Sequence, residues 1–132
     1  MKTMPENVKK LLNAQSVWYI GTYSDTPNAV PVVFKQVAED GSLILADVFM
    51  QTTRANIETN GKIAVSTCDG ATMEGYQIKG SAVYLAEGPV VEACKAMVEG
   101  ATKGGLHAKG AVVVTPEEFI VTTPGPDNNK AL

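Results

Sequence analysis

The segment from Ala46 to Ile57 holds the groups of this chain best suited to binding an anion. Two hydroxyls, Thr52 and Thr53, and one guanidinium, Arg54, fall where a strand pattern ends and a helix pattern begins. Hydroxyls and the free N–H groups of a helix start donate hydrogen bonds, the helix dipole favours negative charge, and an arginine can bind two oxygens at once. Together these groups suit a phosphate. A second interpretation stays open, in which Thr52 or Thr53 only caps the helix and Arg54 is solvated.

Strand patterns dominate the rest of the chain, and helix patterns interrupt them three times. Apolar residues at helical spacing predict an amphipathic helix over about residues 4–14, and a similar pattern behind Gly88-Pro89 predicts a helix of about 12 residues. A short helix begins at Thr52 or Thr53 and stops before Asn60-Gly61. Strands are predicted over residues 16–24, 29–37, 43–47, 62–68, 75–88 and 110–124, the last segment forming one or two strands.

This order of elements predicts a mainly β protein with flanking helices. A sheet of about six mostly antiparallel strands closes its edges most economically by curling into a barrel. A barrel of this size is filled by its own side chains, so a sizeable ligand must lie outside it, against a wall or between two subunits. We expect a single domain over residues 1–132, with a frayed tail over about residues 123–132.

Composition and charge exclude several classes of function. The 132 residues carry 11 Lys+Arg against 14 Asp+Glu, a net charge of −3 with no basic stripe, which argues against nucleic acid as a partner. No window approaches the roughly 18 apolar residues of a membrane span, and the N-terminus lacks a secretion signal, so we expect no membrane association and a cytoplasmic location. Cys68 and Cys94 are expected to be buried thiols. The lone His107 excludes multi-histidine metal sites and is expected to be a solvated loop residue.

The stretch from Thr52 to Ala64 reads Thr-Thr-Arg-Ala-Asn-Ile-Glu-Thr-Asn-Gly-Lys-Ile-Ala. With the strands before and after it, the stretch resembles the FMN-binding split-barrel family related to pyridoxamine 5′-phosphate oxidase, whose recurrent piece is similar to Lys-Thr-x-x-Asn-Ile/Leu-x-x-Asn-Pro-x-Val-Ala. The resemblance covers most of residues 5–122, and Thr53, Asn56 and Asn60 match. The family's phosphate-binding lysine falls on Thr52, and its proline falls on Gly61. Arg54 is a candidate replacement for that charge, although residues two apart on a helix point about 200° apart.

The resemblance implies a six-stranded antiparallel split barrel that pairs into a homodimer and holds flavin mononucleotide (FMN) in the dimer cleft. The backbone of one strand would face the flavin ring, and Lys35 would place a positive charge near it. The implied cofactor-binding residues are Pro31, Val32, Val33, Lys35, Asp47, Met50, Gln51, Thr52, Thr53, Arg54, Asn56 and Gln77. For two of these residues an alternative without a role at the flavin stays open. Lys35 could be a surface lysine, and Gln77 could be an outward-facing strand residue. Trp18, Tyr19 and Tyr23 are expected to be core and interface aromatics rather than groups that stack on the flavin.

The resemblance leaves two functions open. One is a flavin-dependent oxidoreductase acting on a small substrate, and the other is a non-enzymatic FMN carrier or electron-transfer protein. FMN is expected rather than FAD because the chain has no Gly-x-Gly-x-x-Gly turn for a dinucleotide. Oxidation of pyridoxamine 5′-phosphate itself is not expected. Resemblance to the true oxidase would extend to a C-terminal strand with Arg, Trp and His groups that help to hold the substrate, and the segment FIVTTPGPDNNKAL has none of these residue types. No residue is named as a catalytic acid, base or nucleophile.

Overall fold

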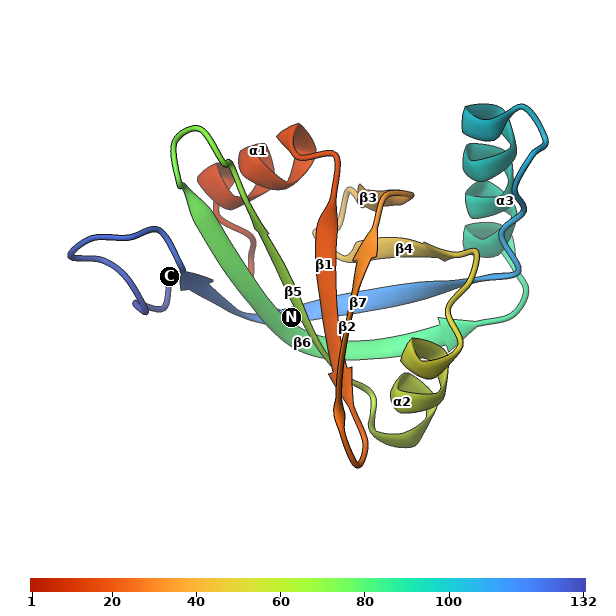
Figure 1. The fold of residues 1–132 in the computed structure, drawn as a ribbon, viewed down its shortest axis with the longest axis horizontal. Coiled ribbons are helices and arrows are strands. Elements are labelled where there is room, and N and C mark those ends of the chain that lie inside the picture. The colour runs from red at the N-terminus through yellow and green to blue at the C-terminus, as the bar shows by residue number, and fades with distance from the viewer.

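In the computed structural model, which describes residues 1–132, one curled antiparallel sheet carries the whole fold (Figure 1). Its strand order is β2-β1-β5-β6-β7-β4-β3, and every neighbouring pair is antiparallel. The elements are α1 (Glu6–Ala14), β1 (Trp18–Tyr23), β2 (Pro27–Val32), β3 (Lys35–Val37), β4 (Leu43–Asp47), α2 (Thr52–Asn60), β5 (Lys62–Cys68), β6 (Gly75–Leu85), α3 (Pro89–Thr102) and β7 (Gly110–Val121). The predicted mainly β fold with flanking helices is confirmed.

The sheet has seven strands rather than about six, because the run predicted over residues 29–37 breaks at Val33 and Phe34. Before the break, β2 pairs with β1 at one edge of the sheet; after it, β3 pairs with β4 at the other edge. Two residues cannot span a flat seven-stranded sheet, whose strands are about 4.8 Å apart. The sheet must therefore curl until its two edges meet at this connection.

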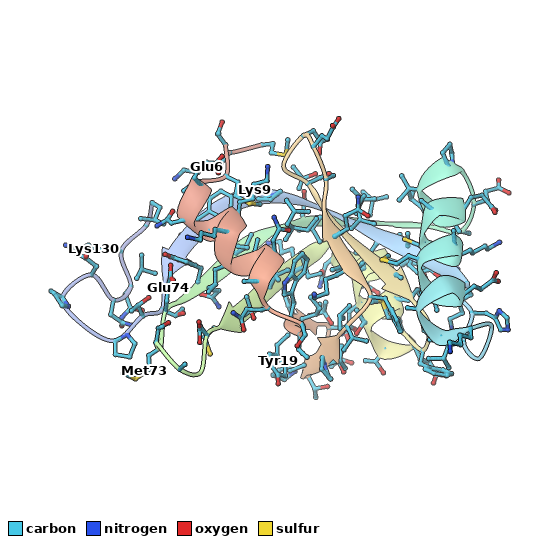
Figure 2. All side chains as sticks on the ribbon, turned by 90° about the horizontal axis from the view of Figure 1, so that it is seen from above. Glu6, Lys9, Tyr19, Met73, Glu74 and Lys130 are labelled. Carbon is cyan, nitrogen blue, oxygen red and sulfur yellow. The ribbon has the colours of Figure 1, made fainter.

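The core lies inside the curl. In β1, β5 and β6 buried residues alternate with more exposed ones, so one face of each strand packs inward. Trp18, Ile20 and Phe119 belong to the main apolar cluster, which α1 covers with Val8, Leu11 and Leu12. Figure 2 shows Glu6 and Lys9 on the outer side of this helix, as its amphipathic pattern predicts.

The long final strand depends on a glycine in its neighbour. β7 runs without interruption from Gly110 to Val121, and its register with β6 shifts between Lys79 and Gly80. A Cβ atom on Gly80 would lie only 2.2 Å from the carbonyl oxygen of Thr115. The two backbones therefore approach here more closely than any other residue type would allow.

Two further expectations differ from the structure. Cys94 is buried on the inner face of α3. Cys68 is exposed, because it falls on the outer face of β5 in alternation with buried Val65 and Thr67. The segment 123–132, expected to be frayed, folds back on β7, where Ile120 bridges to Ala131. His107 lies exposed in the loop between α3 and β7, as predicted. None of the three helices is both long enough and apolar enough to cross a membrane.

Candidate functional site

A cavity of about 490 Å³ opens between β2, the end of β4 and the first turn of α2. This volume is within the range of roughly 300–1,000 Å³ that is usual for small-molecule sites. The residues around it are Asn28, Val30, Pro31, Val32, Val33, Phe34, Ala46, Val48, Phe49, Met50, Gln51, Thr52, Thr53 and Leu106. The structure thus gathers seven of the predicted cofactor residues around one space: Pro31, Val32, Val33, Met50, Gln51, Thr52 and Thr53.

The start of α2 forms the polar end of the cavity. The residue that precedes the helix is Gln51, and no side chain caps it, so Thr52 and Thr53 lie inside the helix instead of serving as its cap. Amides in the first turn of a helix have no partner within the helix, and they attract anions together with the dipole. The first turn also lacks an acidic residue that could satisfy this preference from within the chain.

Thr53 is held by a residue that the sequence interpretation did not name. Its side chain is 2% exposed, and its Oγ1 accepts a hydrogen bond of 3.0 Å from Nδ2 of Asn28 on β2. Because this bond uses a lone pair of the hydroxyl, the hydroxyl proton remains available to another acceptor. A polar amide at residue 28, in alternation with Val30 and Val32, is the sequence signal that could have identified Asn28.

Asn56 and Asn60, the two asparagines that match the family's recurrent piece, connect α2 to β1 by hydrogen bonds. Asn56 is 3% exposed, and its Nδ2 donates to Oγ1 of Thr22 on β1 at 3.1 Å. Asn60 donates in the same way to the carbonyl oxygen of Tyr23 at 2.8 Å. Asn56, expected among the cofactor residues, therefore faces β1 and does not line the cavity.

Asp47 and Arg54 lie beside the cavity and do not line it. Asp47 is fully buried at the end of β4, where its Oδ1 accepts the backbone N–H of Met50 at 2.7 Å and its Oδ2 accepts the hydroxyl of Tyr84. The guanidinium of Arg54 lies 4.1 Å from the centre of the Tyr84 ring and pairs with Glu58 at 3.3 Å. Both charged groups are thus engaged within the chain.

Lys35 and Gln77 lie away from the cavity within one chain. Nζ of Lys35 donates to the carbonyl oxygen of Gln15 at 2.9 Å and lies 5.0 Å from the centre of the Trp18 ring. Burial lowers the pKa of this lysine below its usual value of 10.5. Gln77 lies on β6 opposite Ser66 of β5. The roles implied for them at a flavin stay predictions.

An apolar rim surrounds the rest of the cavity. Phe49 is 81% exposed and Val33 is 54% exposed, which is unusual for side chains of this size. Leu106 reaches the same space from the loop after α3, where its backbone N–H donates to Oγ1 of Thr102 at 3.0 Å. Nothing in the local sequence predicts that Leu106 meets β2, because the two segments are far apart along the chain.

A family model described as pyridoxamine 5′-phosphate oxidase matches residues 4–123, which is most of the chain. The chain belongs to this family. The chain is also 36% identical over 136 residues to an uncharacterized protein of Methanocaldococcus jannaschii; the match covers 100% of this chain and 89% of that protein.

Solved structures show the same fold. HupZ of Group A Streptococcus superposes with a TM-score of 0.79 at 26% identity, covering 95% of this chain and 98% of that one. An FMN-binding protein from Syntrophomonas wolfei subsp. wolfei gives a TM-score of 0.77 at 18% identity, with coverages of 92% and 87%. The predicted family and the predicted split-barrel fold are both confirmed.

Proposed function

We propose that this chain is an FMN-binding flavoprotein that acts as a flavin-dependent oxidoreductase on a small substrate. The observation that carries the proposal is one cavity that joins the uncapped start of α2 to an apolar wall beside β2. A phosphate suits the first end, and a flat apolar ring suits the second. The family membership supports the proposal, as does the FMN-binding protein of Syntrophomonas wolfei that shares the fold.

Thr52, Thr53 and the first amides of α2 would hold the phosphate of FMN. The ring would lie along β2 at Pro31, Val32 and Val33, since β2 pairs only with β1 and leaves its other edge without a strand neighbour. Bound flavin supplies the hydride and electron transfer. The residues of the chain orient the cofactor and exclude water from its ring, because most of the cavity lining is apolar.

We propose further that the site is completed in a homodimer. The outer face of β1 carries two exposed aromatic residues, Tyr19 and Tyr23, on either side of Gly21. Ala29 of β2 and Ala64 of β5 lie opposite that glycine, so small residues separate the two rings. An exposed patch of this kind typically marks a protein interface.

The visible absorption spectrum of the purified protein tests the cofactor assignment. Bound FMN absorbs where the polypeptide does not, so we expect a yellow protein. Heat release followed by mass determination should then identify FMN. A protein that stays colourless after incubation with FMN would refute the proposal, and FAD as the main released species would refute the choice of cofactor.

A second candidate, an FMN carrier or electron-transfer protein, is favoured by one feature of the cavity. Its lining contains no acidic, basic or histidine side chain, so the chain offers no obvious proton donor or acceptor beside the ring. Steady-state oxidation of NADH or NADPH with a small acceptor distinguishes the two functions. Turnover supports the oxidoreductase, whereas reversible reduction of the flavin without turnover supports the carrier.

A further inference from the structure

Tyr84 lies between the two charged residues that flank the start of α2. On one side, its hydroxyl donates a hydrogen bond to Oδ2 of Asp47, a carboxylate with 0% exposure. On the other side, its ring lies under the guanidinium of Arg54, 4.1 Å from the ring centre to Cζ. One side chain from β6 therefore contacts both a buried negative charge and a positive charge next to the cavity wall.

The Asp47 carboxylate is placed where it affects that wall directly. It ends β4, and the next residues, Val48 to Gln51, line the cavity. Its Oδ1 fixes the turn by accepting the N–H of Met50 at 2.7 Å. Only neutral donors contact this carboxylate. Two hydrogen bonds therefore stabilise its charge, and it forms no direct ion pair.

Arg54 stands in the first turn of α2, where the helix dipole disfavours a cation. The face of the Tyr84 ring and the carboxylate of Glu58 stabilise it there. The guanidinium is thus kept near the end of the helix at which an anion would bind.

The position of the Tyr84 hydroxyl is tightly defined. A Cβ atom on Gly110 of β7 would lie 2.1 Å from the hydroxyl oxygen, so only glycine leaves room for this phenol. Burial, together with the hydrogen bond and the negative charge of Asp47, raises the pKa of Tyr84 to about 12. The phenol consequently remains a proton donor throughout the physiological range.

We propose that Tyr84 is a positioning residue for the phosphate end of the flavin site. It acts by balancing the charge of Asp47 and by holding the cation of Arg54 at the first turn of α2. This inference rests on the proposed binding of FMN. It assigns a role to a residue that lines no part of the cavity and that lies 30 residues after Arg54 along the chain.

The decisive variant is Tyr84→Phe, compared with Tyr76→Phe as a matched control. Tyr76 also donates its hydroxyl to a carboxylate, Glu74 at 2.7 Å, and its pKa is also raised to about 12, mainly by burial. Its hydroxyl, however, lies against Asn7 of α1, away from the cavity. The control therefore removes an equivalent hydrogen bond to a carboxylate, but this carboxylate does not lie at the start of α2.

Apoprotein titrated with FMN and, separately, with riboflavin gives the readout. We expect Tyr84→Phe to raise the Kd of FMN about 10-fold, the size of one hydrogen bond to a charged group, and to change the Kd of riboflavin less than about 2-fold. Tyr76→Phe should change neither Kd. Equal losses for both ligands would show a merely structural role and would overturn the inference, as would unchanged FMN affinity.

A double variant, Tyr84→Phe with Asp47→Asn, tests the charge explanation and guards against a fold defect. An asparagine at residue 47 still accepts the N–H of Met50 and no longer needs a second donor, so FMN affinity should return to within about 3-fold of the original. FMN affinity that stays low in a folded double variant would overturn the inference. An unmodified protein that binds neither ligand would instead refute the proposed function.

Discussion

Asn28 and Thr53 join the two sides of the candidate site through one hydrogen bond, from Nδ2 of Asn28 to Oγ1 of Thr53 at 3.0 Å. Asn28 belongs to β2 and Thr53 to the first turn of α2, 25 residues later. The same amide also reaches Oγ1 of Thr22 at 3.4 Å. The bond sets the direction of the threonine hydroxyl, which is the donor we assign to the phosphate.

Replacement of Asn28 by alanine should weaken FMN binding through this hydroxyl. Without the amide, the Thr53 hydroxyl is free to rotate, and we expect a loss of about 1 kcal/mol, roughly 5-fold in affinity. Asn7→Ala is the control, because Asn7 donates a similar bond of 3.1 Å to Tyr76 far from the cavity. Fluorescence titration measures both, and equal affinities for the two variants would contradict the role of Asn28.

Thr53→Ala should weaken FMN binding more than Lys35→Ala, although only the lysine carries a formal charge. A hydrogen bond to a charged group contributes about 1.5–3 kcal/mol, a roughly 10- to 150-fold change in affinity. Lys35 is bound to Gln15 and lies over Trp18, so its loss should lower stability and leave FMN affinity nearly unchanged. A larger loss of affinity at Lys35 in the same titration would place the phosphate elsewhere.

Two glycines should respond to alanine in opposite directions. A Cβ on Gly80 would lie 2.2 Å from the backbone oxygen of Thr115, which cannot move aside cheaply, so Gly80→Ala should cost about 3 kcal/mol. Gly100 lies in α3 with no atom within 4 Å of its Cβ position, so Gly100→Ala should gain about 0.5–1 kcal/mol. Thermal unfolding decides the signs, and a neutral Gly80→Ala would show that the two strands separate more easily than their register indicates.

Stability should fall at alkaline pH because of two tyrosines. The pKa of Tyr76 and that of Tyr84 rise from 10.0 to about 12 on folding, mainly by burial, so the folded state holds protons that the unfolded state loses. This stabilisation is complete below pH 10 and is lost as the pH rises through about 12. Chemical denaturation between pH 9 and 12 should therefore show a shallower decline for Tyr76→Phe than for the unmodified protein; parallel curves would contradict the assignment.

Tyr19→Glu should separate the proposed dimer. Tyr19 is 56% exposed on the outer face of β1, opposite Pro31 and Ser66, where a buried carboxylate would have no partner. Figure 2 shows its side chain at the molecular surface. Light scattering should give the dimer mass for the unmodified protein and for the control Lys9→Glu, and the monomer mass for Tyr19→Glu, with weaker FMN binding. A flavin-loaded monomer of the unmodified chain would refute the shared site.

Local patterns in the sequence determined much of this protein. Alternation along Trp18 to Tyr23, the helical spacing of Val8, Leu11 and Leu12, and the threonines at the start of a helix are all set by neighbours along the chain. Such patterns depend on which face of an element is buried, and burial follows the period of the element itself. The order of the elements and the polar end of the cavity could therefore be predicted.

Tertiary structure alone decided which distant groups meet. The break at Val33 and Phe34 arises because β2 and β3 pair at opposite edges of a curled sheet, and no local signal marks it. Leu106 reaches the cavity, and Tyr84 reaches Asp47 and Arg54, through the register of β6, β7 and β4. Register across strands depends on the packing of the whole sheet, since a shift of one residue would turn the side chains of Tyr84 and Asp47 to the other face.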